Sequence, residues 1–285
     1  MIERTEILLS DLKRFERLMG YTCNIDNPKT HAEKVMRKKY VDRNPLLTLT
    51  ADKIKVEEYI QEKLGNKDIL LPRFTSYRVD EAMTEIEKRV SAHQRIAVKS
   101  NRGSGMNLFI IDKPDLSFVR GCLENWQSSE YGESKGEWCY EDIKPGFLIE
   151  PLVFSGPHII YRFLCFDGIC KYIHAHEYNF KTKNAPGLIA PYAEMCSTYS
   201  EGWEFEIVSY KNYPFRKMSP PASFMKMKKI AEKLSAPFDY CRADLFEHGI
   251  TKQNIGFSEI THYPVSGKCK FDPVSFDHKL GECWS

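Results

Sequence analysis

The chain has 285 residues, of which 42% are hydrophobic and 13% aromatic, so it can bury a sizeable core in one large or two small domains. Its 41 Lys and Arg residues are interleaved with 39 Asp and Glu, which gives no reason to expect nucleic acid or membrane as the main partner. No apolar run approaches the roughly 18 residues that span a bilayer, and the first residues lack a secretory signal pattern. The nine scattered cysteines form no CxxC pair, so we expect free thiols and a cytoplasmic protein.

Helical periodicity marks the part of the chain before residue 70. Apolar side chains recur every three or four positions over Leu8–Met19, Ala32–Tyr40 and Val56–Leu64. Asp52 precedes the last of these stretches and Gly65 follows it, which suits a helix capped at both ends. We therefore predict three helices in this region.

From about residue 95 the pattern changes to strands. Two amphipathic stretches, Leu116–Trp126 and Phe224–Leu234, interrupt them and predict helices. This mixture predicts an α+β fold, with a boundary near residue 145, where Pro145-Gly146 breaks the chain. Runs of apolar, β-branched and aromatic residues predict the strands, over residues 95–100, 108–112, 146–153, 159–166, 170–176, 204–210, 240–246 and 255–260.

A glycine-rich turn, Gly103-Ser104-Gly105, follows the strand that carries Lys99. Glycines let backbone N–H groups approach a phosphate closely, and a lysine on the preceding strand can neutralise phosphate charge. No Gly-Lys-Ser/Thr sequence follows, so the turn is not a P-loop. By itself the motif leaves phosphate binding open, because a two-glycine hairpin beside an exposed lysine is also a common structural element.

Two carboxylates face each other in the predicted final hairpin. Asp244 and Glu259 lie on its two strands, and a pair of close carboxylates is costly unless a cation such as magnesium lies between them. Arg242 lies two positions before Asp244 and therefore on the same face of the strand, where it could stabilise developing phosphoryl charge. The alternative is that Arg242 and Asp244 form an ordinary surface ion pair and Glu259 is solvated.

Taken in order, these landmarks resemble the ATP-grasp superfamily. More closely, the chain is similar to its TupA-like branch, which is named for teichuronopeptide biosynthesis and found among enzymes of bacterial surface-polysaccharide assembly. The resemblance covers roughly residues 35–284. It rests on Asp52-Lys53, Lys99, Gly103-Ser104-Gly105, Glu137-Trp138-Cys139-Tyr140, Lys144-Pro145-Gly146, Ile149-Glu150-Pro151-Leu152-Val153, Asp167-Gly168, Arg242-x-Asp244 and Ser258-Glu259-Ile260-Thr261.

The resemblance implies an ATP-grasp fold, in which two α+β subdomains clamp ATP after a short helical N-terminal segment. The expected divisions are a helical segment at 1–50, a subdomain with a glycine-rich lid at 51–145, and a subdomain with the magnesium site at 146–285. Expected ATP contacts come from Lys53, Lys99, Gly103, Ser104, Gly105, Glu150, Pro151 and Val153. Asp244, Glu259 and Thr261 would hold Mg²⁺, and Arg242 and Arg162 would act on the transferred phosphoryl group.

Several positions depart from the family pattern. Thr261 stands where the superfamily generally has asparagine, so the metal would rely on two carboxylates and water. Ile160 and Arg162 stand where the branch usually has aspartate and lysine, and His176 lies where an arginine is usual shortly after His174. Apart from Thr261, these changes fall in the half of the site nearer the acceptor substrate, whose identity the sequence leaves open.

The function implied by the resemblance is an ATP- and magnesium-dependent ligase. It would join a carboxylate, on a small molecule or a glycan, to an amine through an acyl phosphate, in capsule, O-antigen or teichuronopeptide-type polysaccharide synthesis. One alternative is an ATP-grasp kinase that phosphorylates a sugar hydroxyl, and another is a catalytically idle nucleotide-binding partner of an assembly complex. Glycosyltransferases of the same pathway are possible partners, and the N-terminal helices could dock on them or on the enzyme itself.

Overall fold

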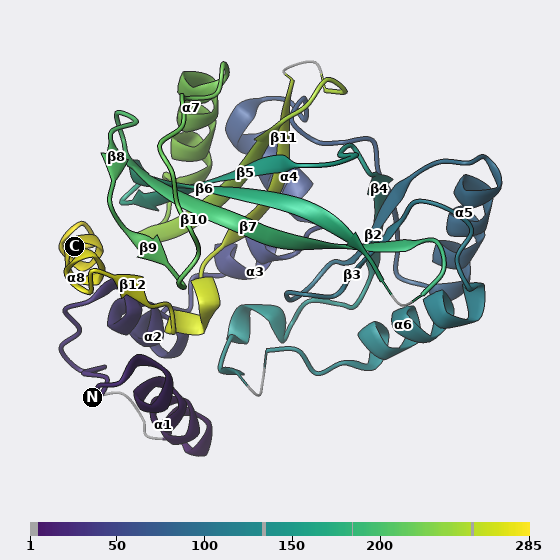
Figure 1. Cartoon of the computed structure of the whole chain (residues 1–285). Coiled ribbons are helices and arrows are strands. Elements are labelled where there is room, and N and C mark those ends of the chain that lie inside the picture. Colours follow the sequence, from purple (N-terminus) through teal and green to yellow (C-terminus); the bar gives the residue numbers. More distant parts are fainter. Residues whose placement is uncertain (1–4, 133–134, 184, 252–253) are drawn as a thin grey trace.

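A ten-stranded antiparallel sheet runs through the molecule (Figure 1). This computed structural model describes residues 5–132, 135–183, 185–251 and 254–285; the first four residues, on which the expectation of no secretory signal partly rests, lie outside these ranges. The strand order is β1-β4-β2-β3-β7-β6-β5-β10-β11, and β8 pairs with β7. Helices cover the sheet at both ends, so the predicted α+β fold is confirmed.

The smaller lobe of the molecule is built on one end of this sheet. Two helices pack against four strands around a core that includes Ile86, Val98, Val119 and Ile149. Alternate residues of the strands face this core, as the two-residue period of a strand requires. The elements of the smaller lobe are β1 (Phe74–Ser76), α5 (Val79–Ser91), β2 (Ile96–Ser100), β3 (Asn107–Ile110), α6 (Leu116–Ser128) and β4 (Phe147–Pro151).

The larger lobe holds the rest of the sheet and the main hydrophobic core. Helix α7 packs against β10, β5 and β6, and α4 packs against α7, where the buried Tyr59 hydroxyl donates to the Leu234 carbonyl at 2.6 Å. Its strands are β5 (His158–Phe166), β6 (Ile169–Thr182), β7 (Leu188–Ser200), β8 (Phe205–Glu206), β9 (Ser209–Tyr210), β10 (Tyr240–Glu247), β11 (Ile255–Thr261) and β12 (Phe271–Asp272). Its helices are α3 (Leu46–Ala51), α4 (Val56–Leu64), α7 (Phe224–Ser235), α8 (Ser275–Glu282) and the short 3-10 helices η2 (Trp138–Tyr140) and η3 (Pro264–Gly267).

The N-terminal helices α1 (Glu6–Met19) and α2 (His31–Val41) dock on the chain's own body (Figure 1). Leu8 and Phe15 of α1 pack in a small core with residues of α2. Asp11 forms a buried ion pair with Lys39 of α2 and lies 2.7 Å from the ammonium of Lys268, which follows η3. These contacts place the first helices against the rest of the chain.

The predicted helices agree with α1, α2, α4, α6 and α7, but two predictions about strands need correction. The predicted strand 170–176 extends to Thr182, because β6 pairs with β7 from Tyr172 to Thr182. The predicted strand 204–210 is two short strands, β8 and β9, separated by Ile207 and Val208. Strand β7 and helix α5 were not predicted. None of the helices in the described ranges is long and apolar enough to cross a membrane.

Asp277 of α8 gives the fold a pH-dependent element. Its carboxylate is 2% exposed and accepts a hydrogen bond from the Ala32 backbone N–H at 3.0 Å. Burial raises the pKa of Asp277 to about 6. Because this folded-state pKa lies above the ordinary value of 3.8, ionisation of Asp277 removes stability as the pH rises from 3.8 to about 6.

We therefore expect Asp277→Asn to flatten the pH dependence of stability. Asparagine keeps the oxygen that caps Ala32 but cannot ionise. The measurement is urea unfolding of both proteins across this pH range. As the pH rises, the free energy of unfolding of Asp277→Asn should increase relative to that of the wild type. Parallel curves for the two proteins would contradict the assignment.

Candidate active site

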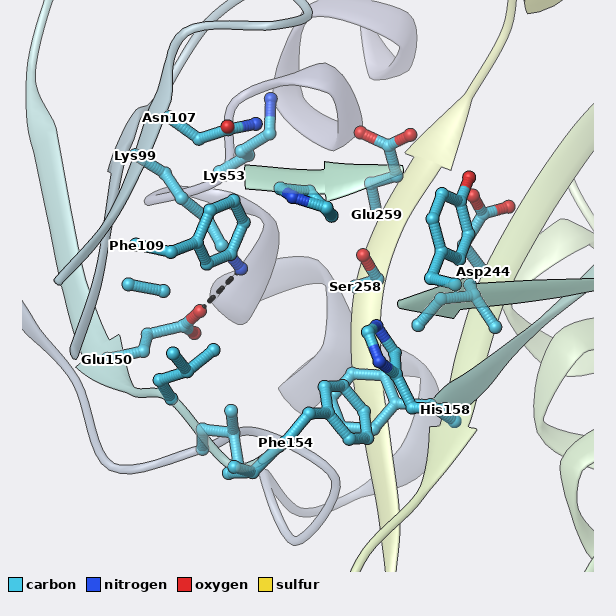
Figure 2. A pocket seen from close by; sticks show the side chains of 18 of the residues that line it. Lys53, Lys99, Asn107, Phe109, Glu150, Phe154, His158, Asp244, Ser258 and Glu259 are labelled. Carbon is cyan, nitrogen blue, oxygen red and sulfur yellow. Dashed lines mark hydrogen bonds and ion pairs between the residues drawn. The ribbon is translucent and has the colours of Figure 1, made fainter. Parts of the chain in front are cut away.

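A cavity of about 360 Å³ lies between the two lobes (Figure 2). Strands β2, β3 and β4 supply one wall, and β5, β6, β10 and β11 supply the other. Strand alternation explains which side chains reach it: Val98 of β2 and Ala243 of β10 point into the cores, whereas Lys99 and Asp244 beside them face the cavity. Segments far apart in sequence thus present their polar residues to one space.

Every residue predicted to contact ATP lines this cavity. Of the other predicted site residues, Arg162, Asp244 and Glu259 also line it. Arg242 and Thr261 do not, but both are hydrogen-bonded to Glu259. The structure therefore brings the whole predicted set together in one region.

Glu150 lies at the centre of a buried charge cluster on one wall. Its carboxylate is 2% exposed and accepts from Lys99 Nζ at 2.8 Å (Figure 2), while Arg73 lies 2.9 Å from its other oxygen. Burial alone would raise the pKa of Glu150, but Lys99 and Arg73 outweigh it and hold that pKa below its usual value. Arg73 also donates to the Lys53 carbonyl at 3.3 Å and so links Lys53 to this wall.

The glycine-rich turn is held by Lys53 and by Asn101. Lys53 Nζ donates to the Gly103 carbonyl at 2.8 Å, and the Lys53 N–H donates to the Asn101 carbonyl at 2.9 Å. The fully buried Asn101 amide donates to Asp52 at 2.9 Å and accepts from the Gly146 N–H at 2.7 Å. The turn after β2 is thereby fixed to the segment before α4 and to the start of β4.

A row of charged side chains crosses the opposite wall. Strand pairing places Arg162 of β5 beside Asp244 of β10, and Asp244 beside Glu259 of β11. Arg162 Nε lies 3.3 Å from an oxygen of Asp244, which is 2% exposed. Burial raises the pKa of Glu259, but Lys53, Arg242 and Arg162 outweigh it, so this pKa is lower than usual and the carboxylate is ionised at neutral pH.

Arg242 lies in the middle of the predicted metal ligands. Its Nε and Nη2 donate to the two oxygens of Asp244, both at 2.6 Å. The same Nη2 also donates to Glu259 and to the Thr261 hydroxyl, each at 3.1 Å. The Arg242–Asp244 ion pair of the sequence-based alternative is present, but it is buried and not at the surface. Glu259, whose side chain is 34% exposed, joins the same network.

The oxygens of this wall fit a hard divalent cation. Within the described ranges, no group of three or more His, Cys, Asp and Glu side chains is gathered as a complete metal site. Magnesium is nevertheless commonly bound by one or two carboxylates together with nucleotide phosphates and water. Asp244 and Glu259 are in direct register and supply those two carboxylates.

Comparison with known proteins assigns the family. A family model of TupA-like ATP-grasp proteins matches residues 33–285, most of the chain. The chain belongs to the TupA-like ATP-grasp family.

Solved structures that are similar to this ATP-grasp chain share little sequence with it. D-alanine–D-alanine ligase from Bacillus anthracis is 14% identical, with 84% of this chain and 67% of the ligase covered and a TM-score of 0.44. VanG D-Ala:D-Ser ligase from Enterococcus faecalis is 14% identical, with coverages of 76% and 54% and a TM-score of 0.42. D-alanyl-alanine synthetase A from Vibrio cholerae is 12% identical, with coverages of 74% and 54% and a TM-score of 0.39. The chain therefore spans little more than half the length of the last two, and no curated protein matches it.

Two neutral histidines support the charged wall of the ATP-grasp site. Arg162 donates to His176 Nε2 at 3.1 Å and to the Tyr178 hydroxyl at 2.7 Å, so Nε2 is an acceptor and the His176 proton resides on Nδ1. His174 Nδ1 pairs with the Thr198 hydroxyl at 3.0 Å. Burial and the neighbouring arginines lower the pKa of both rings well below its ordinary value. His174 and His176 therefore line the buried part of the sheet, with exposed fractions of 3% and 1%.

Sequence reasoning missed several residues of the site. Arg73 and Asn101 lie outside any recognisable motif and are placed by long-range pairing. An aromatic end of the cavity was also missed, where the rings of Phe154 and His158 stack at a centroid distance of 3.9 Å (Figure 2). Phe246 packs edge-on against Phe154 there. Alternation along the predicted strands could have placed Phe246 beside Asp244, because the two lie two positions apart.

The glycine-rich turn of the ATP-grasp site permits a direct test. Gly103 has φ +76°, and a Cβ there would lie 2.7 Å from the Tyr131 ring and 2.8 Å from Met106. Gly105 has φ +80° but no heavy atom within 4 Å of such a Cβ. We expect Gly103→Ala to weaken MgATP binding by at least about tenfold, since left-handed strain and a clash together displace the turn.

Gly105→Ala is the matched control, because it introduces the backbone strain without the clash. Calorimetric titration with MgATP should show a smaller loss of affinity for Gly105→Ala than for Gly103→Ala. Equal affinities for Gly103→Ala and wild type would show that the turn does not pack on bound nucleotide.

Proposed function

We propose that this chain is an ATP- and magnesium-dependent ligase that joins a carboxylate to an amine through an acyl phosphate. Membership of the ATP-grasp family supports ATP as the phosphoryl donor. The observation that carries the proposal is the meeting of Lys53 and Lys99 with Asp244 and Glu259 in one cavity, from walls that are far apart in sequence. Two ammonium groups would hold phosphate oxygens, and two carboxylates would hold the Mg²⁺ that balances the remaining charge.

The proposed division of roles follows the walls of the cavity. Lys53, Lys99 and the Gly103–Gly105 turn would hold the triphosphate, and Glu150 with the backbone of Pro151–Val153 would hold adenine. Asp244 and Glu259, with Thr261 beside them, would hold Mg²⁺, which would screen phosphate charge. The domain divisions at residues 50 and 145 remain a prediction. Strand β4 begins just after residue 145 and pairs with β2 of the smaller lobe.

The proposed chemistry has two balanced steps. A carboxylate oxygen of the first substrate attacks the γ-phosphorus of ATP, and ADP leaves as the new acyl–phosphate bond forms. The nitrogen of the second substrate then attacks the acyl carbon, loses a proton and displaces inorganic phosphate. Arg162 and Arg242 would stabilise the charge on the transferred phosphoryl group, and the closed cavity would keep water from the acyl phosphate.

The proposed setting is bacterial surface-polysaccharide assembly in the cytoplasm. It is supported by membership of the TupA-like family. All nine cysteines are free, which is compatible with a reducing compartment. The carboxylate would then be a uronic acid or a similar group on a glycan precursor, and the enzymes that use the product would include glycosyltransferases.

One experiment tests the proposal and its alternatives. ATP binding is first measured by calorimetry with and without Mg²⁺. The protein is then incubated with MgATP and panels of uronic acids, amino acids and amines while ADP and phosphate are followed separately. A ligase releases both products and requires two co-substrates, whereas a kinase releases ADP without free phosphate. An absence of magnesium-dependent ATP binding would overturn the proposal.

A further inference from the structure

The guanidinium of Arg242 has the surroundings of a bound metal ion. Its Nη2 is within 3.1 Å of an oxygen of each proposed ligand: Asp244, Glu259 and Thr261. Its Nε donates to the second oxygen of Asp244 at 2.6 Å. The lone pairs that a divalent cation would use are therefore already directed at this guanidinium.

Arg242 and a metal ion bound between Asp244 and Glu259 would compete for the oxygens that Arg242 contacts. Arg242 is 6% exposed and Asp244 is 2% exposed, so water screens their interaction poorly. A Mg²⁺ ion bound to the same oxygens would place two further positive charges beside a buried guanidinium that has lost its hydrogen-bond acceptors. That combination is strongly unfavourable unless another anion accepts Arg242.

The surroundings offer such an anion only when nucleotide is bound. Asp244 and Glu259 line the cavity that also holds Lys53 and Lys99, so a triphosphate held there would lie beside these two carboxylates. Arg162 Nε stays 3.3 Å from Asp244 and does not depend on Arg242 for its position, because His176 and Tyr178 hold it. Arg242 can therefore exchange its carboxylate partners for phosphate oxygens while the rest of the wall remains in place.

We propose that Arg242 is an internal cation that closes the metal site of the nucleotide-free protein, so that Mg²⁺ enters only together with nucleotide. This inference rests on the proposed function, since it uses the proposed metal ligands. It makes Arg242 responsible for the order of binding as well as for stabilising phosphoryl charge. It also gives the adjacent carboxylates of Asp244 and Glu259 a shared positive partner.

Direct binding of Mn²⁺, measured by electron paramagnetic resonance without nucleotide, tests the proposal. We expect Arg242→Met to bind Mn²⁺ alone about 100-fold more tightly than the wild type, because the guanidinium that occupies oxygens of Asp244, Glu259 and Thr261 has been removed. Arg162→Met is the matched control: it also removes a guanidinium beside Asp244, but one that is 17% exposed and makes no hydrogen bond to Glu259 or Thr261 within the described residues. We expect it to bind Mn²⁺ as weakly as the wild type.

A second measurement assigns the bound ion and guards against misfolding. Adding Glu259→Gln to Arg242→Met should abolish the gained Mn²⁺ binding. Mn²⁺ should also raise the melting temperature of Arg242→Met but leave that of the wild type unchanged, because the ion replaces the lost cation. Arg242→Lys, which keeps one positive charge but not the two-pronged contact, should bind Mn²⁺ with an affinity between those of wild type and Arg242→Met.

The outcomes separate this inference from the proposed function. Equal binding of Mn²⁺ alone by wild type and Arg242→Met would overturn the role of Arg242, and the function would stand if nucleotide still recruits Mn²⁺ to the wild type. If the wild type binds no Mn²⁺ even with ATP, and binds no ATP, the proposed function fails. The inference would also be overturned by two results obtained together. Mn²⁺ would neither fold nor stabilise Arg242→Met, and Arg242→Lys would have the same Mn²⁺ affinity as the wild type.

Discussion

Glu259→Gln should reduce the ATP turnover of this protein by about 100-fold, the loss expected when one preorganised charge is removed from such a site. Glu259 is an ionised carboxylate of the proposed metal site and accepts from Arg242 at 3.1 Å. Glutamine has nearly the same shape but carries no charge, so it would weaken metal binding while keeping a hydrogen-bond acceptor for Arg242. The measurement is the initial rate of ADP formation at saturating MgATP with the co-substrates found in the panels.

The control for this experiment is Glu62→Gln on the exposed face of α4, whose side chain is 65% exposed and pairs only with Lys63. We expect its ADP formation to equal that of the wild type. Thermal melting of both variants shows whether the fold is intact. A Glu259→Gln protein that turns over ATP at the wild-type rate would remove this carboxylate from the reaction and favour a nucleotide-binding partner without catalytic activity.

Asp11→Asn should lower the free energy of unfolding by about 3–5 kcal/mol, the range seen when one member of a buried ion pair is removed. Asp11 is 7% exposed and is the shared partner of the fully buried Lys39 and of Lys268. It also accepts from the Tyr40 hydroxyl at 3.1 Å. Asparagine would take from two buried ammonium groups the carboxylate that they share between α1, α2 and η3. Urea unfolding at neutral pH measures the change.

Glu16→Gln on the same helix is the control, because Glu16 is exposed and its carboxylate accepts only from the Thr22 hydroxyl, at 2.9 Å. We expect a change below about 1 kcal/mol, as for surface substitutions in general. The prediction about Asp11 fails if the two variants unfold at the same urea concentration. Such a result would mean that α1 is not part of the cooperative unit that contains η3.

The final hairpin shows why part of the site could be predicted from sequence. Asp244 and Glu259 lie on strands joined by a short connection, so local pairing places them opposite one another and the two-residue period directs them to one face. Lys99 and the glycine turn are likewise a local unit. In motifs of this kind the interacting residues lie within about fifteen positions of one another. Their spacing can therefore be read directly from the sequence.

Arg73 and β7 show where sequence reasoning failed. Arg73 reaches Glu150 only because β1 pairs with β4, a contact between distant segments that no local pattern contains. In β7, Pro191 lies within the strand opposite Phe180, and a proline argues against an inner strand when only the sequence is read. Helix α5 is different: Val79, Met83, Ile86 and Val90 repeat at helical spacing, so the pattern was present and was overlooked.

The pairing of β3 with β7 has a consequence for how the molecule can move. Phe109 and Ile110 are in register with Ile189 and Leu188, and the Ile111 N–H donates to the Gly187 carbonyl at 2.9 Å. The hairpin of β6 and β7 therefore tethers the two halves across the gap that ATP would fill. Swinging these halves apart would rupture main-chain ladder bonds, so we expect the amide protons of β3 and β7 to exchange slowly and together. Ligand would then enter while the two lobes remain joined through β3 and β7.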